Sequence, residues 1–423
     1  MINRITLTLV FALSFWTYLV PEPNLSRRFA PLILFAVLVF FKVFCSYSVL
    51  RATGSLFEPD GLLFVLFLSF SMLGPSLASN FRQSIEYWLL TSVCLVLARV
   101  YMAVVSLQEI LEAFFWSGIL SLGMFMVMAF ADLTQAILSL TRFSAFAFEP
   151  NVLAFVLAGY FCAVVWKFMT GGWCRRVFAG LVGFACLAII FFASSRGSLV
   201  AVLVGCLFVA GMKGLGGSKE RRQRFLGLGL LTSALLLGVV FAAQSRGWTG
   251  DTFNFVDQVL ALSTPDRGID SGFTGRFDKW KETLRALSDG TWLTGRGLRS
   301  SDSMYPPIDN SYLVLLYEVG LFPLVLITWR FFGILRRFVR SYFRSTNERQ
   351  RHFYLAWTLL MVVFLVNDIV GRFMFALANP YSLLAFLIFA APGAEMEVYS
   401  ISSTRDLRLS KGVVNWGDTQ QSS

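Results

Sequence analysis

Charge is scarce in this sequence, and histidine is almost missing. Charged residues make up 14% of the 423 residues, whereas an average soluble domain carries about 25%. A soluble chain of this length would form two or three domains, and their surfaces would need more polar residues than this sequence has. A soluble globular enzyme is therefore excluded, and so is a disordered chain. The one histidine, His352, lies among arginines. It is predicted to lie in a cytoplasmic connection, so acid–base chemistry on the outer face must use Asp, Glu, Tyr or Lys, and a histidine metal site is excluded.

Cysteine is also too sparse to form a framework. The six cysteines contain no CxxC pair, and five of them fall within apolar runs. Cysteines in such surroundings usually act as small hydrophobic side chains. The sequence therefore predicts neither disulfides nor a thiolate metal site, and we expect no metal and no cofactor.

Apolar residues, by contrast, make up 56% of the chain. A membrane-spanning helix needs about 20 mostly apolar residues, and about twelve runs approach that length. They lie near residues 5–20, 29–50, 61–79, 87–106, 109–131, 151–169, 175–193, 197–213, 225–245, 310–332, 353–371 and 380–392. The sequence thus predicts an all-α polytopic membrane protein with about twelve transmembrane helices.

The basic residues predict how these helices are oriented. Half of the 36 Lys and Arg fall in the segments 167–176, 213–224, 330–351 and 405–411, which share one side of the membrane if there are twelve helices. The positive-inside rule places this side in the cytoplasm, together with both termini. The net charge of +11 then reflects orientation, and we expect no nucleic-acid partner.

This topology divides the chain into four parts. Residues 1–245 would hold the first nine helices, 246–309 a long outer loop, 310–392 the last three helices, and 393–423 a polar, disordered cytoplasmic tail. Long loops tend to be functional. Within this loop, residues 277–287 have apolar residues at helical spacing, which predicts a short amphipathic helix.

Charged residues beside membrane-spanning helices are costly, so each one is a functional hypothesis. Four arginines face the predicted outer side: Arg196, Arg276, Arg296 and Arg372. Arginine binds phosphate oxygens through two parallel hydrogen bonds and keeps its charge, and an adjacent glycine lets the backbone approach a ligand. The cluster suits a diphosphate, and Asp309 nearby is a candidate base for a sugar hydroxyl.

The same residues also have plain structural explanations. Arginines at helix ends commonly extend toward water or pair with acids. Asp368 and Arg372 are four residues apart and would form an ion pair within one helix. The run 309–311 (Asp-Asn-Ser) is also typical of a helix N-terminal cap, a role that is compatible with catalysis.

The order of five short segments resembles the bacterial O-antigen polymerase and O-antigen ligase superfamily. They are FEPNVLAF (148–155), SSRGSLVA (194–201), TGRFDKW (274–280), TGRGL (294–298) and DNSYLVLLYEVGLF (309–322). The resemblance covers about residues 146–335. It implies a GT-C-like, multi-pass glycosyltransferase of the bacterial inner membrane, with its active site on the large periplasmic loop and the adjoining helix ends.

In this family the donor is an oligosaccharide on undecaprenyl diphosphate within the lipid membrane. The resemblance implies that Arg196 and Arg276 hold the diphosphate, that Asp309 deprotonates the acceptor hydroxyl, and that Glu149 lies at the same cavity. The candidates for substrate binding are Arg296, Asn151, Asn310, Tyr312, Arg372 and Trp280. The resemblance also leaves room for a chain-length regulator protein as a partner.

Three alternatives stay open. Ligases of the family carry a histidine where this chain has Asp309, and Pro323 replaces the expected small or aromatic residue, so the resemblance favours a polymerase over a ligase acting on a lipid A core or another acceptor. A secondary transporter is less favoured, because the two halves show no repeat and the charges lie at helix ends. A structural role would depend on the polar tail.

Overall fold

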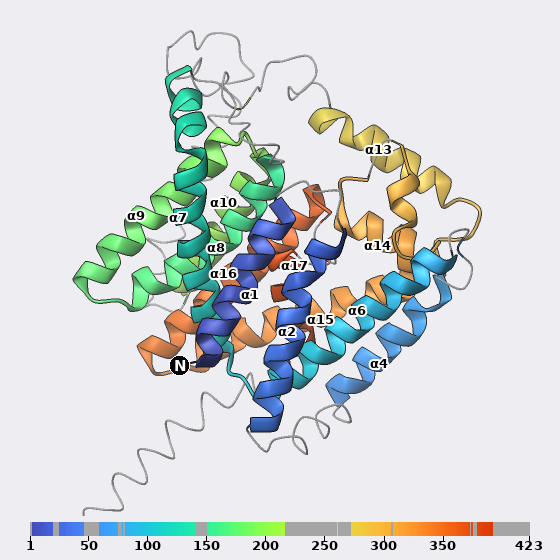
Figure 1. Ribbon diagram of the computed structural model, residues 1–423, viewed down its shortest axis with the longest axis horizontal. Coiled ribbons are helices and arrows are strands. Elements are labelled where there is room, and N and C mark those ends of the chain that lie inside the picture. Colours follow the sequence, from blue (N-terminus) through green and yellow to red (C-terminus); the bar gives the residue numbers. More distant parts are fainter. Residues whose placement is uncertain are drawn as a thin grey trace, which may run out of the picture.

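The computed structural model describes residues 2–19, 25–45, 59–74, 78, 81–139, 150–215, 260, 272–305, 308–372, 374 and 379–391, and every regular element in these ranges is helical. The helices are α1 (Ile2–Leu19), α2 (Leu25–Cys45), α4 (Pro59–Ser71), α6 (Phe81–Met102), α7 (Leu107–Ser139), α8 (Pro150–Thr170), α9 (Trp173–Phe192), α10 (Arg196–Leu215), α13 (Gly272–Ala286), α14 (Ser311–Val319), α15 (Leu321–Arg344), α16 (Glu348–Val370) and α17 (Pro380–Ala390), with a short 3-10 helix at Ser300–Ser303 (Figure 1).

Six of these helices are long and apolar enough to cross a membrane: α6, α7, α8, α9, α10 and α16. Shorter apolar helices lie within α1, α2 and α17. These helices confirm an all-α polytopic membrane protein. The count of about twelve and the four-part division of the chain stay predictions, since the run 225–245 and the tail lie outside the described residues.

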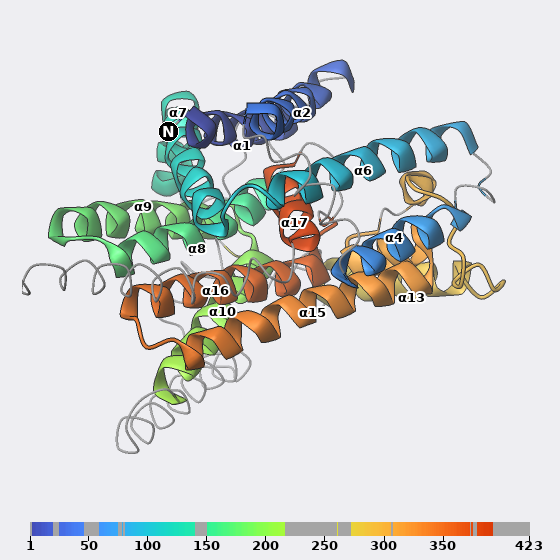
Figure 2. The same ribbon diagram turned by 90° about the horizontal axis from the view of Figure 1, so that it is seen from below.

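The centre of the bundle is built from α16 and α17. Helix α16 packs against α8, α10 and α15, and Figure 2 shows α15 and α16 lying alongside each other. All of α17 is buried, which fits a helix that is apolar on every side. Gly205 of α10 lies against α16, where an added Cβ would come within 2.7 Å of Val363 Cγ2. Small residues at such contacts let membrane helices approach closely.

Two buried arginines donate hydrogen bonds to the carbonyl groups at the end of α17. Arg99 Nη1 donates to Ala390 O at 2.9 Å, and Arg330 donates from Nε to Phe389 O at 3.3 Å and from Nη2 to Ala391 O. The last carbonyls of a helix have no partner within the helix and carry partial negative charge, so a buried cation suits them. Arg330 was predicted to follow the tenth membrane helix, among the basic residues of the segment 330–351. This is wrong, because α15 continues to Arg344.

The predicted helix over 310–332 is interrupted. The segment forms α14 and α15, and the break falls at Gly320, which has a φ of 85°. The predicted amphipathic helix of the long loop is confirmed as α13, although it begins five residues earlier than its predicted start at Phe277. On α13, Phe277 and Leu284 are exposed, whereas Thr283 is buried.

Candidate functional site

Arg196 is the first residue of α10, at the end of the bundle where α16 finishes; this end is called the site end below. The Ser198 hydroxyl donates to Asn367 Oδ1 of α16 at 3.2 Å. Gly197 makes room for α16, because a Cβ there would overlap the side chain of Val370. The SSRG segment therefore fixes the start of α10, and with it Arg196, against the end of α16.

The start of α14 is bound to the same end of α16. Ser311 N donates to Gly371 O at 2.7 Å, and the Ser311 hydroxyl donates to Asp368 Oδ1 at 2.6 Å. Tyr312 lies next to it, and its hydroxyl donates to Leu365 O at 2.9 Å. Asp368 is fully buried. Tyr312 and Asp368 thus hold α14 and α16 together. The Tyr312 hydroxyl is used in a hydrogen bond to the α16 backbone.

Asp309 stands just before α14, and its neighbour Asn310 caps the helix. Asn310 Oδ1 accepts from Leu313 N at 3.0 Å, so the cap predicted from the run 309–311 is Asn310. Asp309 Oδ2 lies 3.1 Å from Lys279 Nζ on α13. Both side chains are partly exposed, at 36% for Asp309 and 25% for Lys279. The candidate base therefore forms an ion pair that also positions α13.

Lys279 was not among the predicted site residues. A lysine on an amphipathic helix normally belongs to its solvated face, and only its place three residues after Arg276 could have drawn attention to it. Residues three apart in a helix are neighbours on its surface, so Arg276 and Lys279 share a face of α13. Trp280, the next residue, packs its ring against Phe277 at 5.4 Å between centroids. Trp280 Nε1 is buried and makes no hydrogen bond to the rest of the described chain.

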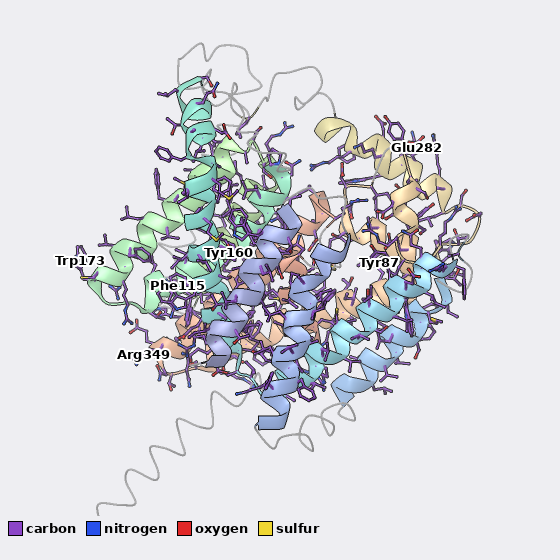
Figure 3. All side chains as sticks on the ribbon, in the orientation of Figure 1. Tyr87, Phe115, Tyr160, Trp173, Glu282 and Arg349 are labelled. Atoms are coloured by element: carbon purple, nitrogen blue, oxygen red, sulfur yellow. The ribbon has the colours of Figure 1, made fainter. Side chains whose placement is uncertain are left out.

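A series of contacts at the site end connects the helices that carry three predicted residues. The start of α10 with Arg196 is bonded to α16, α16 is bonded to the start of α14 beside Asp309, and Asp309 is paired with α13, which carries Arg276. In Figure 1, α13 lies beside α14 at this end. Figure 3 shows Glu282 of α13 on the same side of the molecule as Tyr87 of α6, which lines a cavity together with Ser311.

The Arg296 side chain forms hydrogen bonds with the residues just before it in the chain. Its Nη2 donates to Ala286 O and to Asp289 Oδ2, each at 2.6 Å, and its Nε donates to Thr291 Oγ1 at 3.2 Å. Its guanidinium also lies over the Tyr317 ring at 5.3 Å. Hydrogen bonds from Thr291, and after them the charge of Arg296, lower the pKa of Asp289. The structure thus gives Arg296 a role in holding the loop, and its use as a phosphate ligand stays a prediction.

The glycines beside Arg296 serve contacts within the protein. Arg296 N donates to Tyr317 O and Gly297 N to Glu318 O, both at 2.8 Å, and Leu321 N donates to Trp292 O at 2.9 Å. The first two bonds satisfy carbonyls at the end of α14, where it breaks, and the third joins the first residue of α15 to the same loop. The TGRG turn was interpreted as backbone that approaches a ligand. In the structure its N–H groups bind the broken helix.

Arg372 lies beyond the end of α16. Its Nη1 is 3.4 Å from Asp302 Oδ1, and Asp302 Oδ2 is 2.7 Å from Arg299 Nη2. The predicted pair of Asp368 and Arg372 within one helix is wrong, because α16 ends at Val370. Arg372, Arg299 and Asp302 line a cavity of about 60 Å³, which has room for water molecules and not for a sugar.

The EPN segment is described only in part. Asn151 lies in the first turn of α8 and is half-buried. Because α8 and α9 pack as neighbours joined by a short turn, the start of α8 lies at the end where α9 finishes and α10 begins. Glu149 lies outside the described residues. Its place at the site stays a prediction.

The fold and these contacts define a polytopic membrane protein with arginines and a paired carboxylate gathered at one end of its helices. Residues 181–328 match the sequence model of a family described as O-antigen ligase. This match supports placing the chain in the O-antigen polymerase and ligase superfamily, whose activity is of the membrane glycosyltransferase type, and it does not distinguish polymerase from ligase. The matched range includes Arg196, Arg276 and Asp309 and ends before Arg372. No curated protein matches the chain.

Proposed function

We propose that the protein is a polysaccharide polymerase. It would transfer an oligosaccharide from undecaprenyl diphosphate to a hydroxyl of an acceptor repeat unit. The observation that carries this proposal is the pairing of Asp309 with Lys279 at the end of the bundle where Arg196 begins α10. A carboxylate there supplies the base that the single histidine cannot supply, because His352 lies near the start of α16, at the opposite end of that helix.

The proposed reaction is a direct displacement at the anomeric carbon of the donor. The acceptor oxygen attacks this carbon while Asp309 takes the hydroxyl proton. The bond from the carbon to the phosphate oxygen breaks, and its electron pair leaves with the diphosphate. Arg196 and Arg276 stabilise the charge that develops there. Trp280 stays a predicted substrate-binding residue in this scheme. Cleavage of the bond between the sugar and the diphosphate supplies the free energy for the transfer, so no other reactant is needed.

Lys279 has two tasks in this scheme. Without substrate it holds the Asp309 carboxylate at 3.1 Å. Because Lys279 shares a face of α13 with Arg276, an incoming diphosphate attracts its ammonium group as well. Binding of the donor then loosens the ion pair and leaves the carboxylate for the acceptor hydroxyl.

We further propose a location in the inner membrane of a bacterium, with both termini in the cytoplasm and the site facing the periplasm. The support is the distribution of basic residues. The start of α9 carries Arg175 and Arg176, and the end of α15 and the start of α16 carry several more arginines. These helix ends lie opposite Arg196 and Asp309. A chain-length regulator protein stays a predicted partner.

A transfer assay with purified protein tests the proposal. The protein is placed in lipid nanodiscs with a synthetic undecaprenyl-diphosphate repeat unit and without ATP or an ion gradient. We expect a ladder of longer lipid-linked glycans. Product that forms only after addition of a lipid A core acceptor would identify a ligase instead. Absence of any transfer, with uptake of the glycan into sealed vesicles, would identify a transporter.

Substitution of the two arginines tests the diphosphate site. Arg196→Ala and Arg276→Ala should each reduce the initial rate of transfer by about 10²- to 10³-fold, because a donor to the developing charge is lost. Lysine at either position should restore only part of the rate, because it cannot form two parallel hydrogen bonds. The measurement is the initial rate at equal amounts of folded protein.

Arg82→Ala is the matched control for these variants. Arg82 lies at the start of α6, and its side chain is 92% exposed. It forms an ion pair with Glu86 in the next turn of the same helix. Its loss removes the same charge from an exposed position and should leave the rate unchanged. An Arg196→Ala or Arg276→Ala variant with the rate of the control would refute the assignment of that arginine.

A further inference from the structure

A second cavity lies at the opposite end of the bundle from the candidate site. It has a volume of about 530 Å³ and lies between the end of α8, the start of α9, the end of α10 and the start of α16. Its wall combines apolar side chains, Phe168, Trp173 and Val177, with basic ones, Arg176, Lys213 and His352. None of its described lining residues is acidic.

This cavity is separate from the candidate site. His352 lies near the start of α16 and Asp368 near its end, so about 24 Å of helix separates them at 1.5 Å per residue. Figure 3 shows Trp173 and Arg349 on the side of the molecule opposite Tyr87 and Glu282. The chemistry proposed for Asp309 makes no use of this region.

The apolar wall continues along the outer face of α9. Trp173 is 80% exposed, and Leu181 and Phe184 on the same helix are 65% and 73% exposed. Such a stripe on a helix long and apolar enough to cross a membrane suits contact with lipid, and tryptophan is typical of the boundary between membrane and water. The hollow is open at Gly180, where an added Cβ would still lie 3.8 Å from the nearest ring atom of Phe168.

The basic part of the wall comes from three helices. Arg176 of α9 is held by a hydrogen bond from its Nε to Gly171 O at 2.9 Å. Lys213 of α10 lies 3.7 Å from Met169 Sδ, which is a weak acceptor. His352 belongs to α16, one turn after Glu348. Two cations and an imidazole thus converge at the mouth of an apolar hollow.

We propose that this cavity binds one anionic phospholipid. Its phosphate would lie between Arg176 and Lys213, and an acyl chain would follow Phe168, Trp173 and Val177 along α9. Basic pockets between membrane helices suit lipid head groups of negative charge. The apolar part of the wall would give a free phosphate no contact, so the cavity as a whole favours a ligand that joins a phosphate to an acyl chain. The lipid would hold together the ends of α8, α9, α10 and α16.

Thermal unfolding in detergent, titrated with defined lipids, tests the proposal. The wild-type protein should gain stability with phosphatidylglycerol or cardiolipin, and should gain much less with phosphatidylcholine or inorganic phosphate. The Arg176→Gln/Lys213→Gln variant should bind the anionic lipids at least about tenfold more weakly, which corresponds to about 1.4 kcal/mol. Gly180→Leu, which fills the hollow without changing charge, should weaken binding of the same lipids.

Arg336→Gln/Arg340→Gln is the matched control. Both arginines are exposed on α15 near the same end of the bundle, and the change in charge is the same. This variant should keep the wild-type lipid affinity. An equal loss in the control would overturn the proposal in favour of general surface attraction. Unchanged binding in Gly180→Leu would also overturn it, as would an equal response of the wild type to phosphate alone.

Discussion

An Asp309→Asn variant should fold normally and lose about 10²- to 10⁴-fold in the rate of glycan transfer, so that single repeats accumulate and long chains disappear. Asparagine keeps the shape of the side chain but cannot take a proton. Folding should be preserved, because Asp309 is partly exposed and its pair with Lys279 is a surface ion pair worth about 1 kcal/mol or less. The measurement is the length distribution of lipid-linked product at matched protein levels.

Lys279→Met separates loss of the base from loss of the ion pair. This variant removes the cation at 3.1 Å from Asp309 and leaves the carboxylate in place. It should retain measurable transfer with a raised KM for the donor, whereas Asp309→Asn should lower kcat. Asp309→Glu should recover part of the rate, because a carboxylate is still present. Normal chain lengths from Asp309→Asn would remove Asp309 from the mechanism.

Local composition was enough to predict most of the helices. Apolar runs such as 151–169 and 353–371 match α8 and α16 closely, because a helix is the form in which a lipid-exposed segment satisfies its backbone. The break at Gly320 could not be predicted in this way. It depends on N–H groups from residues 296–297, which lie about twenty residues earlier in the chain, and the apolar run itself continues through it.

The candidate site shows the same division between local and distant information. Residue type and position at helix ends made Arg196 and Asp309 candidates, and the structure places both at the site end. The roles of Arg372 and Tyr312 depend on contacts with residues that are distant in the sequence. Arg372 pairs with Asp302, seventy residues earlier in the chain, and the Tyr312 hydroxyl bonds to the backbone of α16. The sequence does not show which distant residue a polar side chain will contact in the fold. The same limit explains why Lys279 was missed.

Gly320 gives the prediction with the largest effect on folding. Its φ of 85° and ψ of 179° belong to a region that is essentially restricted to glycine. An added Cβ would overlap Leu293 O and would lie 2.7 Å from the carbonyl carbon of Thr294 and 2.8 Å from Gly295 N. These are backbone atoms, so rotation of a side chain cannot relieve the overlap. A Gly320→Ala variant must therefore displace the turn at 293–297.

The expected loss of stability in Gly320→Ala is about 4 kcal/mol or more. The strained conformation contributes about 1–3 kcal/mol, and each of the backbone hydrogen bonds between the turn and the broken helix contributes about 0.5–1.5 kcal/mol. For a chain of this size the midpoint of thermal unfolding should fall by about 4 °C or more. The measurement is thermal unfolding in the same detergent as the wild type.

Two other glycines separate strain from overlap. Gly290 also has a positive φ, of 90°, but has no heavy atom within 4 Å of an added Cβ, so Gly290→Ala should lose only about 1–2 kcal/mol. Gly333 lies within α15 with equally open surroundings, so Gly333→Ala should gain about 0.5–1 kcal/mol. If Gly320→Ala were no less stable than Gly290→Ala, the overlap with the turn would not exist.

The same substitution should also reach the proposed chemistry. The turn at 293–297 grips the last carbonyls of α14, and Asp309 stands just before the first residue of that helix. Because α14 has only nine residues, a shift at its end moves its beginning. The fraction of Gly320→Ala protein that stays folded should therefore transfer glycan more slowly than folded Gly290→Ala protein. Equal rates would mean that the helix break supports the fold alone and does not position Asp309.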